Sequence, residues 1–317
     1  MQNLSEELKK IRVAPAMAFG GLTVFPLLKK EAVTCDYVTL AEAFKLDGVN
    51  ITEVSQGGSV PELRFKNLLK KDIFAADGEA LLGAKQHRVL NSSIFVGAGE
   101  EVIVPVSCVE QGRWSYDGDL FRKAEYSEFV QSRAAKMESV AYSLKSGSTR
   151  RRSNQGAVWD AVASKGRQFG THSPTESMAD IYESKRPALD EYVRKLRLQP
   201  GQVGLCCVVD GEICGIELFE SPGVLGQFLP RLIRSYAAEV LGNELRAAIV
   251  PDSSRVRSLL RKICRADLDE YAAVGKGKEL RFSLKRLDGA ALMVGERLIH
   301  LVSLARRNHS SRRSQAL

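Results

Sequence analysis

Three polar clusters in the first third of this chain contain the residues that are best suited to chemistry. The first cluster, TEVSQGGS, places Glu53 just before a turn that Gly57 and Gly58 form. The exposed amides of such a turn can receive an anion, and the carboxylate can act as a general acid or base. The alternative is a simple hairpin turn with an outward-facing acid, because two glycines alone are weak evidence for a site.

The second cluster, GAKQHRVLNSS, carries four long polar side chains in a row. If the stretch is a strand, Lys85, His87 and Asn91 face one side of the sheet. Gln86 and Arg88 then face the other side, and both sets line one pocket only if a bulge intervenes. A solvated edge strand explains the same charges without any function.

The third cluster, VSCVEQGRW, combines a thiol, a carboxylate, a guanidinium and an indole. Strand alternation puts Cys108 and Glu110 on one face, and a nearby carboxylate raises the pKa of a thiol. We therefore expect Cys108 to be a packing residue and not a nucleophile. Arg113 suits a phosphate or a carboxylate because its fork makes bidentate contacts, with an ion pair to Glu110 as the alternative. Trp114 can stack on a flat ligand, although core packing is the commoner fate of a tryptophan.

The segments that carry these clusters are short and punctuated by glycines. Strands are expected at 22–28, 50–55 and 60–68, and a short helix at 38–44. The pair Asp77-Gly78 predicts a hairpin. Many short strands at close spacing indicate an antiparallel barrel or sandwich-like unit over residues 13–122.

The rest of the chain, residues 123–305, predicts an α+β domain. Helices are expected at 126–147, at 158–167 with Ser153 or Asn154 as cap, and at 176–196 with Ser173 or Thr175 as cap. The polar stretch 146–155 between the first two is the best candidate for an interior linker. A hairpin around Asp210-Gly211 precedes a long helix at 223–241, and late strands follow near 280–284, 291–294 and 298–304.

The composition is that of a globular protein: 317 residues, of which 44% are hydrophobic and 26% are charged. No apolar run reaches the roughly 18 residues needed to span a bilayer, and the N-terminus lacks a long apolar core. We therefore expect a cytoplasmic protein with no membrane partner. Six scattered cysteines without a CxxC pair predict reduced thiols, and the four distant histidines predict no metal site. Neither a cofactor fingerprint nor a catalytic motif is present, and the oligomeric state stays open.

The net charge of +8 is unevenly distributed. Basic residues gather in three places: Arg150 to Arg152, a group made of Arg255, Arg257, Arg261, Lys262 and Arg265, and a tail at 306–317 that contains no acid. Such a tail can hold nucleic acid. We favour a flexible, solvated terminus, because no aromatic side chains interleave with these arginines.

Taken together, these motifs resemble a known family, the ADP-ribosylglycohydrolase- and rhodanese-phosphatase-associated protein domain family, type one. The matching stretches are LTVFPL, TEVSQGGSVPEL, ADGEALLGAKQHRVLN and VIVPVSCVEQGRW, and weaker similarity extends to about Ala237. The resemblance implies a prokaryotic protein in the context of ADP-ribose or NAD metabolism. It supplies no established activity and no catalytic residues. At His87 the family pattern is expected to have Asn, which speaks against a catalytic histidine there.

These observations lead to three functional hypotheses. In the first, the protein binds a small anionic or nucleotide-like ligand through Lys85, Gln86, Arg88, Asn91, Arg113 and Trp114. In the second, it is a hydrolase in which Glu53 and Glu110 are the paired catalytic carboxylates. In the third, it is an interaction module with weak nucleic-acid contact. The sequence leaves open whether the protein is an enzyme, and it indicates no cofactor.

Overall fold

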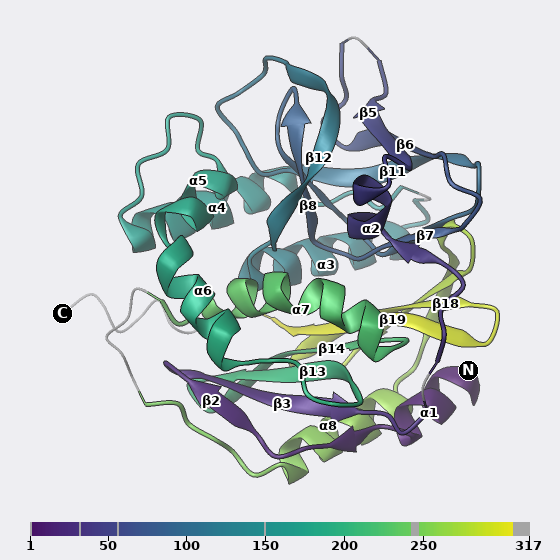
Figure 1. Ribbon diagram of the computed structural model, residues 1–317, viewed down its shortest axis with the longest axis vertical. Helices are drawn as coiled ribbons and strands as arrows, with labels where there is room; N and C mark the ends of the chain where they lie inside the picture. The colour runs from purple at the N-terminus through teal and green to yellow at the C-terminus, as the bar shows by residue number, and fades with distance from the viewer. Residues whose placement is uncertain (1, 32, 56, 149, 242–246, 307–317) are drawn as a thin grey trace.

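The computed structural model describes residues 2–31, 33–55, 57–148, 150–241 and 247–306 (Figure 1). Its strands form three sheets, and the largest is antiparallel with nine strands. In spatial order these are β1 (Arg12–Val13), β3 (Leu22–Leu28), β13 (Gln202–Val209), β14 (Glu212–Phe219), β19 (Arg297–Ala305), β18 (Leu287–Val294), β17 (Lys278–Ser283) and β15 (Asp269–Ala272), with β2 (Met17–Phe19) paired to β3. The sheet thus joins strands from both ends of the chain.

The other two sheets form the N-terminal β-rich region. The six-stranded sheet runs β12 (Asp117–Ser127), β8 (Glu79–Ala84), β9 (Arg88–Leu90), β11 (Glu101–Cys108), β6 (Glu62–Asn67) and β5 (Val49–Glu53). The four-stranded sheet runs β16 (Val274–Gly275), β10 (Ile94–Val96), β7 (Ile73–Ala75) and β4 (Val38–Thr39). The two edge strands of the six-stranded sheet, β12 and β5, lie against each other, so that sheet curls into a nearly closed barrel. The expected α+β class with an N-terminal barrel-like region is confirmed.

Eight helices are described, and most lie between or beside these sheets (Figure 1). They are α1 (Gln2–Lys9), α2 (Leu40–Lys45), α3 (Val130–Lys145), α4 (Gln155–Phe169), α5 (Met178–Ser184), α6 (Arg186–Lys195), α7 (Pro222–Ala237) and α8 (Ser254–Cys264). Helices α3 and α7 separate the nine-stranded sheet from the barrel, whereas α1 and α8 cover its opposite face. None of the described helices is long and apolar enough to cross a bilayer.

The hairpin that the sequence predicts most strongly is confirmed. Strands β13 and β14 pair antiparallel across Asp210 and Gly211, whose φ angles of 50° and 78° suit a type I′ turn. The adjacent cysteines of β13 point to opposite faces, since Cys207 packs in the core beside α7 and Cys206 packs in the core beneath α1 and α8. Helix α7 packs on this hairpin and continues through Pro230.

Other local expectations are wrong. Asp77 and Gly78 do form a turn, but it joins β7 of one sheet to β8 of another, so it closes no hairpin. The helix expected at 176–196 is two helices, and its cap is Ser177, whose hydroxyl accepts from the amide of Ala179. Strand β12 lies where no strand was expected, because its half-exposed residues lack an apolar run.

Candidate functional site

A turn between β8 and β9 brings several of the expected site residues together. Strand β8 ends at Ala84 and β9 begins at Arg88, so the intervening residues are not strand. Gly83 and Ala84 have φ angles of 120° and 43°, a left-handed backbone that ends the strand and breaks the side-chain alternation. The expectation that Lys85 and Gln86 face opposite sides of one strand is therefore wrong. Gln86 accepts a hydrogen bond from Arg88, and Lys85 and Arg88 both lie over the ring of Trp114.

Arg88 is the buried cation at the centre of this cluster, with an exposed fraction of 0%. Its Nη1 donates to Gln86 Oε1 at 3.1 Å and to the carbonyl of His87 at 3.4 Å. Its Nε and Nη2 atoms have no hydrogen-bond partner among the residues that the structure describes. Burial lowers the pKa of Arg88, because the surroundings remove its charge from water. A buried guanidinium with two unpaired donors is costly unless something accepts from them.

Glu53, at the end of β5, supplies the nearest carboxylate to Arg88. Its exposed fraction is 8%, and its Oε1 lies 3.7 Å from Arg88 Nη2. That separation is an ion pair without a hydrogen bond, and in the described part of the chain neither carboxylate oxygen accepts one. The carboxylate of Glu53 thus offsets the charge of Arg88, while the Nε and Nη2 atoms of Arg88 donate to no described residue.

Two aromatic rings cover the two cations. Lys85 Nζ lies 5.1 Å from the ring centroids of both Trp114 and Tyr116, and the guanidinium carbon of Arg88 lies 5.9 Å from that of Trp114. These distances are those of cation–π contacts. Trp114 has an exposed fraction of 48%, so much of its indole surface remains open to solvent.

The β5–β6 turn closes over the same cluster. Lys85 Nζ donates to the carbonyl of Gly57 at 2.9 Å. Gly58, with φ of 75°, approaches so closely that an added Cβ would lie 3.1 Å from Lys85 Cδ and 3.2 Å from Trp114 Cζ2. Only glycine adopts this backbone at so short a distance without strain. We define the Arg88 site as Glu53, Lys85, Arg88 and Trp114 with this turn.

Glu110 and Arg113 form a separate clamp beside the Arg88 site. Arg113 Nη2 donates to Glu110 Oε2 at 2.7 Å, and Nη1 donates to the carbonyls of Ala84 and Ser115 at 2.7 and 2.8 Å. Glu110 also accepts from the amide of His87 at 3.0 Å. Burial raises the pKa of Glu110, but the hydrogen bond from Arg113 and the charge of His87 outweigh it, so the pKa is lowered. Glu110 and Arg113 therefore hold the β8–β9 turn in place, and few of their hydrogen-bonding atoms remain for a ligand.

The remaining expected residues, Gln86, Asn91 and Cys108, do not belong to the Arg88 site as defined above. Gln86 donates to the carbonyl of Glu110 at 3.0 Å and accepts from Arg88, so it orients the guanidinium. Asn91 instead ties the barrel to the 146–155 stretch, donating to the carbonyl of Arg151 at 2.9 Å. Cys108 is buried, and burial raises the pKa of its thiol.

A buried ionic network, which no sequence pattern predicted, lies between the barrel and the large sheet. Arg133 and Lys136 of α3 are fully buried and meet three carboxylates there, Asp77, Glu128 and Glu217. Gly78 leaves room for Arg133, since an added Cβ would lie 2.5 Å from its Nε. Helix α3 also buries apolar residues at helical spacing, among them Ala134, Met137 and Val140, so the sequence offered no signal that Arg133 and Lys136 are buried beside them.

A serine, a histidine and a glutamate also adjoin in this network. Ser93 Oγ lies 2.7 Å from His300 Nδ1, and His300 Nε2 lies 3.5 Å from Glu217 Oε2. His300 packs among the rings of Phe74 and Phe219, however, and Glu217 is committed to Arg133 at 2.9 Å. We therefore assign these contacts to the packing of the two layers and not to catalysis. Among the described residues, no three His, Cys, Asp or Glu side chains group as a metal site would require.

Comparison with known proteins adds one result. The sequence profile of the ARG and Rhodanese-Phosphatase-superfamily-associated Protein domain matches residues 10–304. No curated protein and no solved structure matches the chain.

Proposed function

The chain belongs to this family, and we propose that it binds a small anionic, nucleotide-like ligand at the Arg88 site. One observation carries the proposal: Arg88 is fully buried, and no described residue accepts a hydrogen bond from its Nε or Nη2. Two oxygens of a phosphate or a carboxylate would accept from the two donors at once, because the guanidinium fork matches their geometry. The association with ARG proteins in the family name supports ADP-ribose as the first ligand to test.

The aromatic part of the site supports a ligand with a flat portion as well as a charge. The half-exposed Trp114 offers a stacking surface next to two cations. Stacking of a base on an aromatic side chain contributes roughly 1–3 kcal/mol. Among the described residues, Lys85 donates only to the carbonyl of Gly57, so a phosphate can replace that contact with a charge-assisted one.

The hydrolase hypothesis finds less support in this geometry. It needs Glu53 and Glu110 to share one substrate, yet each faces its own arginine. Glu110 further accepts from the Thr175 hydroxyl at 3.0 Å, which leaves it fixed within its clamp. Its lowered pKa also disfavours the protonated form that a general acid requires.

Calorimetric titration with ADP-ribose, ribose 5-phosphate and adenosine tests the proposal. We expect ADP-ribose to bind more tightly than either fragment, because only it engages both the cations and the indole. Trp114→Ala is expected to weaken ADP-ribose binding by about tenfold through lost stacking. The matched control is Tyr142→Ala in α3, which removes a ring that is 76% exposed and distant from the site in sequence and contacts. Absence of binding for all three compounds, or an equal effect of the two variants, would contradict the proposal.

Glu53→Gln separates binding from catalysis. The carboxylate of Glu53 lies 3.7 Å from Arg88 and competes with an incoming anion. Its neutralisation is expected to tighten the binding of ADP-ribose by about three- to tenfold, as the loss of one nearby like charge does. Binding weakened by the substitution, or a measurable turnover that the substitution abolishes, would favour the paired-carboxylate hydrolase instead.

A further inference from the structure

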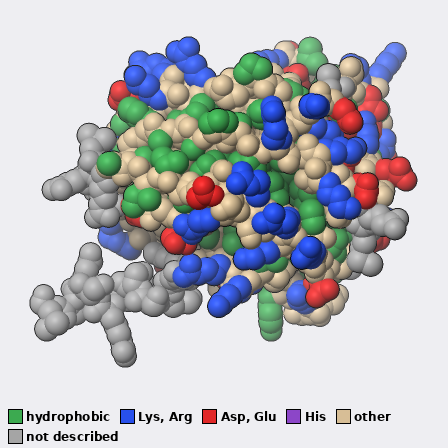
Figure 2. Space-filling view, turned by 90° about the horizontal axis from the view of Figure 1, so that it is seen from below, with side chains coloured by type: hydrophobic (Ala, Val, Ile, Leu, Met, Phe, Trp, Pro, Cys, Tyr) green, Lys and Arg blue, Asp and Glu red, His purple; other side chains and the backbone are tan. Residues whose placement is uncertain are grey.

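Helix α8 presents a row of cations on the face of the molecule opposite the barrel. Its apolar residues Val256, Leu259, Leu260 and Ile263 are buried against the nine-stranded sheet. Its outward side and C-cap carry Arg255, Arg257, Arg261, Lys262 and Arg265, all exposed, and the helix contains no acid. Figure 2 views this side of the molecule, where Lys and Arg side chains gather around a patch of hydrophobic ones.

Most of these cations are not neutralised by the protein. Arg255 pairs with Glu212 at 3.3 Å. Within the described part of the chain, Arg257, Arg261, Lys262 and Arg265 form no ion pair. Three of them, Arg257, Arg261 and Arg265, follow one another at four-residue spacing, so they line up about 6 Å apart along the helix. A regular row of unpaired charges suits a partner whose own charges repeat.

A groove runs along one flank of this helix. It has a volume of about 460 Å³ and an apolar floor that includes Leu259, Leu284 and Leu287. Its rim carries Arg255, Lys262, Lys285, Arg286 and Arg306, against the single acid Glu212. We define the α8 face as the outward side of α8 together with this groove.

Arg306 brings a further basic side chain to the groove. Arg306, the last described residue, lines the groove and pairs with Asp288 at 2.7 Å. The residues that follow, 307–317, lie outside the described part of the chain. Their sequence adds Arg307, Arg312 and Arg313 and no acid.

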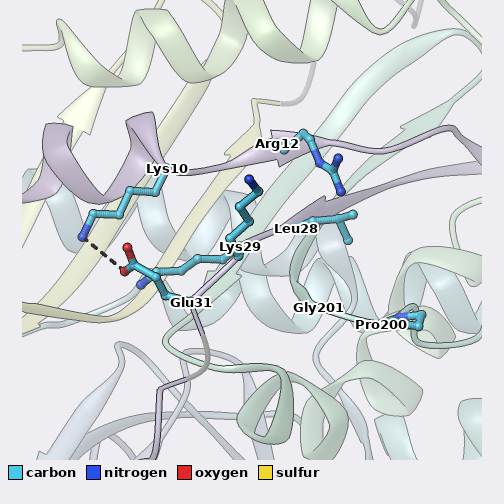
Figure 3. Close-up of a pocket in the computed structure, with 8 residues that line it drawn as sticks. Lys10, Arg12, Leu28, Lys29, Glu31, Pro200 and Gly201 are labelled. Atoms are coloured by element: carbon cyan, nitrogen blue, oxygen red, sulfur yellow. Dashed lines mark ion pairs between the residues drawn. The ribbon is translucent and has the colours of Figure 1, made fainter.

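A second basic hollow is less suited to an anion (Figure 3). It has a volume of about 540 Å³ and is lined by Lys10, Arg12, Lys29 and Lys30 beside Glu31. Lys29 and Lys10 each pair with Glu7 at 2.7 Å, and Lys10 also lies 3.8 Å from Glu31, the pair marked in the figure. Two of the four cations, Lys10 and Lys29, are thus already paired with carboxylates.

We propose that the α8 face binds duplex nucleic acid through its phosphate backbone. The unpaired arginine row carries this choice, because regularly spaced cations match the repeating phosphates of a duplex. The apolar floor of the groove lies beside this row, since Arg257, Arg261 and Arg265 do not line the groove. The groove lining and the exposed residues of α8 include no aromatic side chain, so the surface lacks the stacking contacts that single strands use. Binding is accordingly independent of base sequence and sensitive to salt.

Fluorescence anisotropy with a labelled duplex DNA of mixed sequence tests this, using the full chain at several salt concentrations. With four unpaired α8 cations engaged, the logarithm of the association constant is expected to fall with the logarithm of salt concentration with a slope of about −4. The double variant Arg257→Glu/Arg261→Glu is expected to weaken binding by more than about tenfold and to bring the slope to about −2.

The control is Lys66→Glu/Lys70→Glu, which makes the same change in charge at exposed positions in and just after β6, at the opposite end of the molecule. It is expected to leave most of the affinity in place. The proposal is overturned if the duplex does not bind at low salt, or if the control variant loses as much affinity as the α8 variant. It is equally overturned if an acidic peptide of the same charge displaces the duplex at equal concentration, since that result would make the partner a protein segment.

Discussion

Glu217→Gln is expected to lower the free energy of unfolding by about 3–5 kcal/mol, the usual cost of breaking a buried ion pair on one side. Glu217 is fully buried on β14, where its carboxylate accepts from Arg133 Nη1 at 2.9 Å and from the Tyr236 hydroxyl at 3.1 Å. The amide keeps the shape but removes the closer of the two carboxylates that compensate the guanidinium of Arg133, the other being Asp77 at 3.4 Å. Denaturant unfolding followed by circular dichroism measures the change.

The matched control lies on the same strand. Glu212 is exposed and pairs with Arg255 and Arg286 at 3.3 and 3.2 Å, so Glu212→Gln is expected to cost less than about 1 kcal/mol. If the two substitutions cost the same, the buried network does not hold the two layers together.

The same carboxylate predicts how stability depends on pH. Burial raises the pKa of Glu217, but the charges of Arg133 and His300 outweigh it and lower the pKa from 4.5 to about 2. The unfolded chain therefore binds this proton more readily than the folded protein does, and stability is lost as pH falls from about 4.5 toward 2. At about 1.4 kcal/mol per pKa unit, this contribution is roughly 3 kcal/mol. In the Glu217→Gln variant, the free energy of unfolding is expected to fall less steeply than in the parent protein as the pH is lowered from about 4.5 toward 2. If both proteins show the same pH dependence, other groups cause the loss of stability in acid.

Replacing Arg88 has the largest expected effect on binding. Replacing either partner alone leaves the other buried without its counter-charge, so Arg88→Met is made together with Glu53→Gln, and the Glu53→Gln reference is also checked for folding. The double variant Glu53→Gln/Arg88→Met is expected to lose at least about a hundredfold in affinity for ADP-ribose relative to Glu53→Gln alone. This estimate follows from the roughly 1.5–3 kcal/mol of each hydrogen bond to a charged group. Calorimetry gives the affinities, and a thermal melt confirms that both variants fold. Equal affinities in the two folded variants would exclude Arg88 as the anion-binding group.

Local sequence signals predicted much of the fold. The β13–β14 hairpin followed from two apolar runs around Asp210-Gly211, and α7 followed from its apolar stripe. The hairpin and the helix are both determined by residues that are close together in the sequence. The pairing of β3 with β13 joins residues far apart in the chain, and nothing in either strand specifies its partner.

The Arg88 site was predicted in composition but not in arrangement. The sequence identified these residues by their chemistry. The assumption of a continuous strand, however, placed Lys85 and Gln86 on opposite faces, because the left-handed backbone of Ala84 that ends the strand cannot be recognised from the sequence. Tyr116 was missed, although it lies two residues after Trp114 and shares the contact with Lys85. The burial of Arg133 could not be predicted either, because its compensating charges, Asp77 and Glu217, come from two distant segments.

We infer that Arg88 donates hydrogen bonds from its Nε and Nη2 to the anionic group of the ligand. Nitrogen-15 NMR of the arginine Nε–H groups tests it most directly, with the Arg88 signal assigned by its loss in the Glu53→Gln/Arg88→Met variant. On titration with ADP-ribose, the Arg88 Nε–H resonance is expected to move downfield and to saturate at the calorimetric midpoint, as a new hydrogen bond forms. A saturable binding isotherm during which this resonance stays in place would contradict the account, since the ligand would then bind elsewhere.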